Sequence, residues 1–317
     1  SVPLTCYEGK GYRRETFESI STLLENYYAS RDTITRIRQK SSDLRRIVQT
    51  ALERSCKKYD LQLKQLKDTE KREKYRIYGE LLNTYGYELK GGEKSFKCIN
   101  YYDNEEITIP LDPQLTAREN AQKHFDKYNK LKRTYEALSQ LTMETKAEVD
   151  HLESVSSALD IALEENDLVQ IKEELMEFGY VKKRRANEKR PKITSKPFHY
   201  ISSDGYDIFV GKNNYQNEEL TFKVASGNDW WFHAKGIPGS HAIVKSNGQA
   251  DLPDRVFEEA GALAAYYSKG RENDKVEIDY IQKKNIKKVA GAAPGFVIYH
   301  TNYSLVASPR CDLKEVK

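Results

Sequence analysis

Apolar residues recur at steps of three and four along the first part of the chain, from about Phe17 to Tyr85. The segment is highly charged and contains no proline, and this spacing gathers the apolar side chains on one face of a helix. We therefore predict one long helix over 17–85, which Gly86 can end. The apolar positions are Ile34, Ile37, Leu44, Val48 and Ala51, followed after a shift of register by Leu52, Tyr59 and Leu66.

A second long helix is predicted over 117–178. It opens on a capping box, Thr116-Ala-Arg-Glu119, in which the Thr116 hydroxyl and the Glu119 carboxylate satisfy backbone N–H groups at the helix start. Phe178-Gly179 supplies a stop. Seven-residue steps along this helix indicate a coiled-coil seam. Its two rows are Tyr128, Tyr135, Thr142, Val149, Ser156 and Leu163, and then Leu138, Thr145, Leu152 and Leu159.

The segment 87–113 between the two helices predicts a small β-meander. Gly91-Gly92 and Asp103-Asn104 supply its turns, and two prolines close it. The insert lets the chain reverse, so the helices can pair antiparallel within one molecule as a coiled-coil arm over 17–181 with a β tip. Pairing between two molecules is the alternative that the seam alone leaves open.

The composition changes after a basic linker at 182–196. Glycine, aromatic and β-branched residues become frequent, and the pattern predicts a compact mixed α/β domain over 197–310. The predicted fold is therefore α+β and multidomain: a remnant at 1–16, a long antiparallel helical coiled coil with a small β tip, this domain, and a tail at 311–317. The expected strands lie near 198–201, 206–210, 229–235, 241–246, 275–281, 295–300 and 303–307, and the expected helices at 216–225 and 254–268. The second of these helices has an apolar face of Val256, Ala260, Leu263 and Tyr267.

Composition narrows the class of protein. A length of 317 residues suits about two domains, and 32% charged residues with a mean hydropathy of -0.78 argue against a membrane protein. The four cysteines, Cys6, Cys56, Cys98 and Cys311, form no C-x-x-C pair, so neither a disulfide framework nor a zinc site is expected. No secretory signal is visible in SVPLTCYEGK, and we expect a cytoplasmic location.

Charge is informative through its distribution. The net charge is only +4, but the linker carries eight Lys and Arg residues against Glu188 alone. Such a run is usually a solvated linker, and it is also where a polyanion would be attracted.

The stretch DWWFHAKGIPGSHAIVK (229–245) carries the candidate chemistry. Strand alternation places Trp230, Phe232 and Ala234 on a core face. It places four polar or aromatic side chains on the other face, namely Asp229, Trp231, His233 and Lys235. The Gly-Ile-Pro-Gly turn that follows is rigid, because its glycines can adopt positive φ and its proline fixes φ.

Four interpretations of this stretch compete. His233 and His241 are too few for a metal site, which needs three or four ligands. Ser240 and His241 are neighbours on a strand and point apart, so they do not suit a nucleophile and its base. An ordinary hairpin with hydrogen-bonded histidines is the plain alternative. The fourth is an RNA contact, with Trp231 as a stacking surface and Lys235 and Lys245 as charges.

A second basic stretch in the same domain favours the RNA contact. In Gln282–Lys288 the four lysines would be paired neighbours if the segment were helical, and the loop Ala290–Gly295 would offer backbone amides to phosphates. The candidate RNA-binding residues are Asp229, Trp231, His233, Lys235, Ser240, His241, Lys245, Lys283, Lys284, Lys287 and Lys288.

Five longer stretches together resemble one family closely. They are similar to the bacterial NFACT family, which is often labelled fibronectin-binding protein A-like and includes RqcH of ribosome-associated quality control. The resemblance covers nearly the whole chain from about Phe17. The stretches are IPLDPQLTARENAQKHFDKYNKLKR (109–133), SSDGYDIFVGKNNYQNEELTFKVA (202–225), DWWFHAKGIPGSHAIVK (229–245), EEAGALAAYYSKGR (258–271) and GAAPGFVIYHTNYSLVASP (291–309).

The resemblance implies a domain order and a function. An NFACT-N domain, a helix-hairpin-helix region and a coiled coil precede an NFACT-R domain thought to bind RNA, and this chain is expected to hold the last two parts and to lack NFACT-N. The implied partners are rRNA of the large ribosomal subunit, stalled peptidyl-tRNA and the tRNA recruited for C-terminal alanine tailing. We therefore expect a noncatalytic RNA- and ribosome-binding protein with no catalytic residue, metal or cofactor.

The older family label implies a rival function, a surface adhesin that binds fibronectin or another extracellular-matrix protein. The lack of a visible export or anchoring signal argues against it. A metal-dependent enzyme using His233 and His241 is the third possibility.

Overall fold

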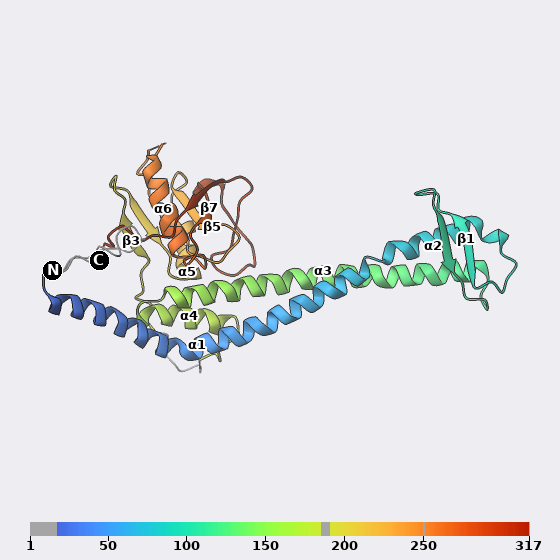
Figure 1. Ribbon diagram of the computed structural model, residues 1–317, viewed down its shortest axis with the longest axis horizontal. Helices are drawn as coiled ribbons and strands as arrows, with labels where there is room; N and C mark the ends of the chain where they lie inside the picture. Colours follow the sequence, from blue (N-terminus) through green and yellow to red (C-terminus); the bar gives the residue numbers. More distant parts are fainter. Residues whose placement is uncertain (1–17, 185–190, 250, 317) are drawn as a thin grey trace, which may run out of the picture. The chain divides into compact units, whose positions relative to one another are not determined.

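The computed structural model describes residues 18–184, 191–249 and 251–316. The predicted remnant at 1–16 and part of the predicted basic linker, 185–190, lie outside the described residues. The chain forms two compact units, one of Thr50–Glu153 and the other of the segments on either side of it. Long helices followed by a sheet-rich domain confirm the predicted α+β class (Figure 1).

Each of the two predicted helices is interrupted once. The first consists of α1 (Ile20–Thr69) and α2 (Arg72–Tyr85), and the second of α3 (Ala117–Ile161) and α4 (Glu165–Glu177). The prediction that each of these two helices runs without a break was therefore wrong. Periodicity alone does not reveal such breaks, because the apolar spacing resumes after each of them.

A local cap explains the second interruption. The Asp167 Oδ2 atom accepts hydrogen bonds from the backbone N–H groups of Leu163 and Glu164, each at 3.0 Å, and so fixes the start of α4. Leu163, which the heptad pattern places in the seam, lies beyond the end of α3 and is 43% exposed. The predicted capping box at the start of α3 is confirmed, with Thr116 N–H donating to Glu119 Oε2 at 2.8 Å.

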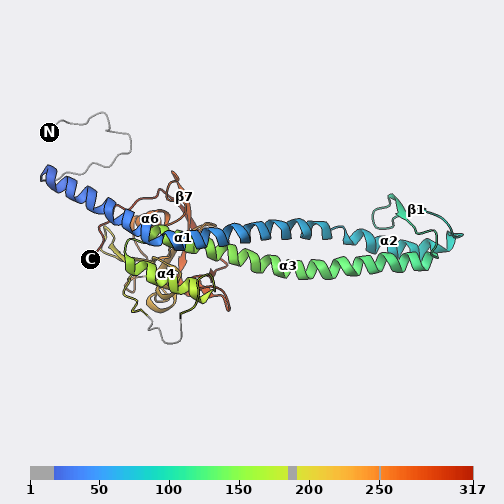
Figure 2. The ribbon, with the colours of Figure 1, turned by 90° about the horizontal axis from the view of Figure 1, so that it is seen from below.

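The unit of Thr50–Glu153 pairs α2 with α3 and carries a two-stranded sheet (Figures 1 and 2). Its strands β1 (Ser95–Ile99) and β2 (Glu106–Pro110) form one antiparallel hairpin instead of the predicted meander. Within this unit α2 and α3 of the same chain pack against each other, as the intramolecular alternative predicts. The buried core consists of Tyr78, Leu81, Leu82, Phe96, Ile109 and Ala121.

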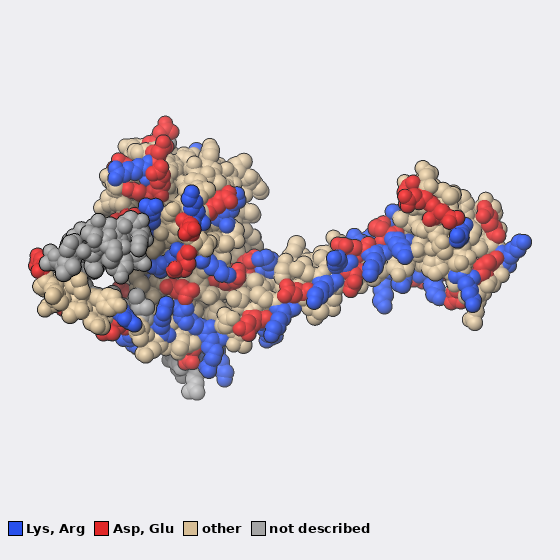
Figure 3. Space-filling view, viewed as in Figure 1, with Lys and Arg blue, Asp and Glu red and all other residues tan. Residues whose placement is uncertain are grey.

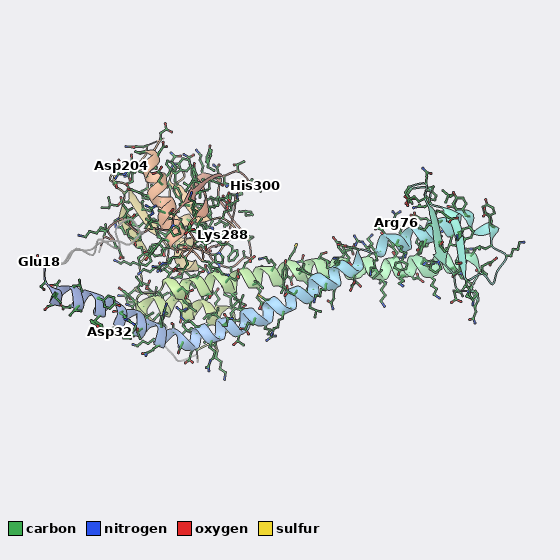
Figure 4. The ribbon with its side chains drawn as sticks, in the orientation of Figure 1. Glu18, Asp32, Arg76, Asp204, Lys288 and His300 are labelled. Atoms are coloured by element: carbon green, nitrogen blue, oxygen red, sulfur yellow. The ribbon has the colours of Figure 1, made fainter. Side chains whose placement is uncertain are left out.

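Two features of this unit show how closely its elements approach. A Cβ atom at Gly79 would lie 2.7 Å from the Phe125 ring, so glycine is what allows α2 and α3 to approach here. Arg76, labelled in Figure 4, donates to the Tyr102 hydroxyl at 3.3 Å, and that hydroxyl donates to Glu80 Oε2 at 2.7 Å. These bonds tie the hairpin turn to α2.

The sheet domain is built on a six-stranded antiparallel sheet with the order β10-β7-β5-β6-β4-β3. The predicted strands are confirmed with small shifts of their ends, except that the strand expected near 295–300 is a short strand of a separate two-stranded sheet. The strands are β3 (Phe198–Ile201), β4 (Asp207–Val210), β5 (Trp230–Ala234), β6 (Ala242–Val244), β7 (Val276–Gln282) and β10 (Tyr303–Ala307), with β8 (Lys287–Lys288) paired to β9 (Val297–Ile298).

One face of this sheet packs on helix α6 (Asp254–Tyr266). The apolar stripe predicted for α6, Val256, Ala260, Leu263 and Tyr267, is buried together with Phe232 and Ala234 of β5. Gly261 allows a close approach, because a Cβ atom there would lie 2.7 Å from Leu305 of β10. The core face predicted for β5 is therefore confirmed.

A second apolar layer covers the opposite face. It comprises Leu220, Ala225, Trp231, Ile243, Ile281 and Ile286. Helix α5 (Asn214–Glu219) and the π-helical turn Leu220–Val224 occupy the region predicted as a helix over 216–225. The central strand β5 is consequently buried on both of its faces.

We expect Leu81→Ala to destabilise the unit of Thr50–Glu153 by about 2–5 kcal/mol, because truncation of a fully buried leucine leaves a cavity. Urea unfolding followed by circular dichroism measures the change. Leu61→Ala is the matched control, because Leu61 is 56% exposed and its truncation opens no cavity. Equal destabilisation by both substitutions would contradict the assigned core.

Candidate functional site

The hairpin of β5 and β6 lies at the centre of the sheet, and its predicted polar face is mostly interior. Trp231 is 1% exposed, with its ring 5.3 Å from the Tyr299 ring and 5.1 Å from the His241 ring. The expectation that Trp231 offers a stacking surface is wrong, because the π-helical turn Leu220–Val224 and the segment after β7 cover this face.

The two histidines flank this tryptophan. His233 is half-buried and stacks on Trp231 with ring centroids 5.6 Å apart. His241 is 3% exposed, and its Nδ1 atom lies 2.7 Å from the Thr221 hydroxyl. The Asn217 side-chain oxygen accepts the His241 backbone N–H at 3.0 Å.

Burial keeps both imidazoles neutral. Desolvation lowers the pKa of His233 from 6.5 to about 4, although a hydrogen bond with the Gly239 backbone and the nearby Asp279 carboxylate partly oppose this effect. Desolvation, followed by the proximity of His233, lowers the pKa of His241 well below its usual value. At neutral pH neither ring therefore carries a charge that would attract phosphate.

The rings of His233 and His241 contact each other edge to face, with ring centroids 5.5 Å apart. Across residues 18–184, 191–249 and 251–316, no three His, Cys, Asp or Glu side chains gather closely enough to hold a metal ion. Ser240 is 2% exposed, and its backbone N–H donates to the Tyr267 carbonyl at 2.9 Å.

Asp229 acts as a buried hydrogen-bond acceptor at the start of β5. It is 1% exposed and accepts from the backbone N–H groups of Ser226 at 2.7 Å and Ser246 at 2.9 Å, and it also pairs with Lys245. Burial opposes ionisation, but the bonds from Lys245, Ser246 and Ser226 outweigh it and lower the pKa of Asp229. Asp229 therefore joins the loop before β5 to the end of β6.

Asp279 plays the same role one strand away, and sequence reasoning missed it. It lies opposite His233 in the β5–β7 register. Its carboxylate accepts from the Tyr299 hydroxyl at 2.8 Å, the Asn302 amide at 2.7 Å and the Ser304 hydroxyl at 2.7 Å. The available signal was Asp279 itself, one of two carboxylates inside the otherwise β-forming run VEIDYIQ.

A larger polar network joins α4 to α5, also without a prediction from the sequence. Lys212 donates to Asp167 at 3.4 Å, Asn213 to Gln170 at 2.9 Å, and Asn214 to both Ser154 at 2.8 Å and Glu174 at 2.7 Å. The signal was the cluster of amides in GKNNYQNE directly after β4. Because these partners are buried, the network fixes α5 over the sheet.

The predicted lysines differ in their ion pairs and in their exposure. Lys235 pairs with Glu277, and Lys245 with Asp229. Lys283 is half-buried, its Nζ atom 5.9 Å from the Phe222 ring centroid. The exposed lysines of the predicted set are Lys235, Lys284, Lys287 and Lys288.

The lysine segment is not the helix on which the predicted spacing depended. A short 3-10 turn over Lys283–Asn285 leads into β8, so the lysines are not neighbours at four-residue helical steps. Figure 4 labels Lys288 on the sheet domain, where its Nζ atom lies 2.6 Å from Glu218 Oε1.

The glycine-rich loop, Ala290–Gly295, is hydrogen-bonded to the carboxylate of Glu218 as well. Gly295, at φ +80°, donates its backbone N–H to Glu218 Oε2 at 3.3 Å. Glu218 therefore occupies a position between an ammonium and a backbone amide, the two kinds of group that bind phosphate oxygens.

Two family models match the chain and define its class, a helical region followed by an RNA-binding domain. NFACT N-terminal and middle domains match residues 2–194, and the NFACT protein RNA binding domain matches residues 196–300. The first match alone covers more than half of the chain, which therefore belongs to the NFACT family. The expected absence of the N-terminal NFACT domain is wrong, because the model for the N-terminal and middle domains matches this chain.

Curated relatives include two proteins named Rqc2 homolog RqcH. The protein of Streptococcus suis is 43% identical over 304 residues, and that of Bacillus subtilis is 36% identical over 315 residues. These alignments cover 95% and 98% of this chain, and 54% of each relative. The chain thus spans about half the length of the curated relatives it matches.

A solved structure is also similar. It is the C-terminal part of the fibronectin/fibrinogen-binding protein of Streptococcus suis, with 37% identity and a TM-score of 0.67. The similarity covers 87% of this chain and 97% of that one. Among the residues that the structure describes, no helix combines the length and apolar character of a membrane span.

We expect His233→Gln to reduce the loss of stability between about pH 6.5 and pH 4. In the unfolded chain His233 takes up a proton below its usual pKa of 6.5, whereas the folded ring stays neutral to about 4, so acidification favours unfolding. Removing this group should lessen the acid-induced change by up to about 2 kcal/mol. Urea unfolding at a series of pH values measures it, with the exposed His300→Gln variant as control.

We expect Trp231→Ala to destabilise the sheet domain by about 3–5 kcal/mol, because the indole fills the second apolar layer. Thermal or urea unfolding measures the effect. Trp231→Phe should retain most of the stability. A Trp231→Ala variant with unchanged stability would restore the stacking interpretation.

Proposed function

We propose that this chain provides RNA- and ribosome-binding surfaces of a ribosome-associated quality-control factor. The observation that carries the proposal is the match of residues 196–300 to the NFACT RNA binding domain, in a chain whose relatives are named RqcH. In its full form, the factor acts in the cytoplasm on a large subunit with stalled peptidyl-tRNA and recruits tRNA for alanine tailing. This chain contributes binding and positioning rather than catalytic groups.

The exposed lysines near β8 are the proposed phosphate contacts. Lys284, Lys287 and Lys288 are exposed, and Lys283 lies half-buried beside them. On the visible face of the sheet domain Lys and Arg are interspersed with Asp and Glu, so a local cluster rather than overall charge supplies the attraction (Figure 3). The buried members of the predicted set, Asp229, Trp231, Ser240 and His241, act by shaping the domain.

Glu218 restrains this surface in the proposed mechanism. Its carboxylate occupies the position between Lys288 and the Gly295 amide, so an RNA phosphate must displace it to use both donors. The exchange replaces an internal carboxylate with a phosphate and lowers the net affinity.

The helical region supplies reach in this proposal, as a coiled-coil arm with a β tip. Helix α1 has 50 residues and α3 has 45, lengths of roughly 75 and 70 Å at 1.5 Å per residue. Helices of this length suit a partner as large as a ribosomal subunit.

We expect Lys284→Ala/Lys287→Ala to weaken binding to large ribosomal subunits and to tRNA. The slope of log affinity against log salt concentration should fall in magnitude by about 1–2, because binding with fewer phosphate contacts releases fewer counterions. Glu218→Gln should act in the opposite direction and strengthen binding. Co-sedimentation and filter binding at several salt concentrations measure both effects.

Lys275→Ala/Lys314→Ala is the matched control, since both lysines are exposed elsewhere in the domain. Equal weakening by the two double variants would show that net charge, rather than this surface, determines binding. Absence of binding to either ligand at low salt would refute the proposed function.

A second candidate function is adhesion to fibronectin, which the name of the structurally similar Streptococcus suis protein favours. Immobilised fibronectin and large ribosomal subunits can be compared directly as ligands for the same preparation. Saturable binding to fibronectin, with none to ribosomal subunits or tRNA, would favour the adhesin.

A further inference from the structure

Three aromatic rings form a continuous row from the middle of the six-stranded sheet to one of its edges. Phe232 of β5 lies opposite Tyr280 of β7, and Tyr280 lies opposite Tyr303 of β10. The Phe232 and Tyr280 rings stack with centroids 5.5 Å apart and planes at 14°, and the Tyr280 and Tyr303 rings with centroids 5.4 Å apart and planes at 27°. We call these three residues the aromatic row. Because its members are direct cross-strand neighbours, the sheet itself holds their rings in line.

The aromatic row ends in an exposed ring. Exposure rises from 0% at Phe232, through the half-buried Tyr280, to 62% at Tyr303. Strand β10 is the last in the sheet order, and one face of the Tyr303 ring stacks on Tyr280, so the opposite face is turned away from the sheet. Trp230 and Phe257 pack around Tyr280, with ring centroids 5.8 Å and 5.3 Å from it, and hold it in place behind Tyr303. The outer face of Tyr303 is therefore a fixed, flat and apolar surface.

The charge beside the aromatic row disfavours an anion at this surface. Burial, followed by the proximity of Tyr303 and of the Asp254 carboxylate, raises the pKa of Tyr280. Asp254 is the first residue of α6 and is exposed. Its negative charge would repel a phosphate from the row, but it would not repel a neutral planar group.

The lysine segment lies at the same end of the sheet as Tyr303. Strand β7 carries Tyr280 and ends at Gln282, and Lys283 and Lys284 follow it directly. Tyr303 is the first residue of β10, which runs antiparallel to β7, so it lies near the end of β7 that leads to the lysines. Lys284 is exposed and follows Tyr280 by four residues, at most about 13 Å along an extended chain. A short single strand of RNA could therefore contact both the ring and the lysines.

We propose that the outer face of the Tyr303 ring is a stacking site for an unpaired base of single-stranded RNA, whose phosphates contact Lys284 and Lys287. This inference rests on the proposed RNA-binding function, and adds to it the form of the RNA and the group that is recognised. Bases of a duplex are already stacked on one another, whereas an unpaired base can turn out onto an aromatic ring. Every base has such a flat surface, so the site tolerates different bases and selects single strands over duplexes. Because the sheet fixes the ring before RNA binds, little conformational entropy is lost on binding.

Fluorescence anisotropy with the full 317-residue chain and a labelled oligoadenylate tests the proposal. We expect Tyr303→Ala to weaken binding of the oligoadenylate about tenfold, within the range produced by loss of one base–aromatic stack. The slope of log affinity against log salt concentration should stay the same, because no phosphate contact is lost. Tyr303→Trp should retain the affinity. An RNA duplex of the same length should bind equally to the Tyr303→Ala variant and to the unchanged chain.

Val306→Ala is the matched control. Val306 is 64% exposed on the same strand, and strand alternation places it on the face opposite Tyr303. Its truncation should leave the affinity unchanged, and circular dichroism should show that all variants are folded. Unchanged affinity of Tyr303→Ala, a smaller salt slope for that variant, or equal weakening by Val306→Ala would overturn the stacking site.

Failure of the stacking site can be distinguished from failure of the proposed function. A chain that binds tRNA at low salt but not the oligoadenylate would overturn the stacking site and leave the RNA-binding function standing. The same conclusion would follow if Lys284→Ala/Lys287→Ala weakens binding of the oligoadenylate while Tyr303→Ala does not. A chain that binds neither ligand would overturn both.

Discussion

Burial of the central strand β5 on both faces is the constraint on which the sheet domain depends. Phe232 and Ala234 pack beneath α6, and Trp231 fills the layer beneath α5 and its π-helical continuation. A strand buried on both faces needs cover on both, so the loops and helices around it must be fixed. Hydrogen bonds from a few buried polar side chains provide that attachment.

Those buried polar groups hold segments of the domain together and are not exposed to bind a ligand. Asp229 and Asp279 each join separate segments of the domain, and Asn214 joins α5 to α4. The histidines beside Trp231 are neutral at physiological pH because burial lowers their pKa. In the proposed function, exposed lysines attract the RNA, and Glu218 pairs with one of them, Lys288.

Family membership and the local chemistry agree on the kind of partner. The matched RNA binding domain coincides with the part of the chain that carries the lysine segment and the glycine-rich loop. The helical unit contributes differently. Its apolar core, with Leu81, Leu82 and Ala121, closes between α2 and α3 within the chain.

Local patterns in the sequence were sufficient for the class of fold, the capping box at Thr116, the apolar face of α6 and most strands, because these depend on residues near one another in the chain. The interior position of Trp231 and the partners of Asp279 were not predictable in this way. An exposed and a buried face of a strand look alike when both carry aromatic residues, and only the packing of the π-helical turn and of the segment after β7 distinguishes them. Tertiary structure likewise decided that the lysine segment is a turn and strand, because its backbone pairs with Asp229 and Gly227 instead of continuing a helix.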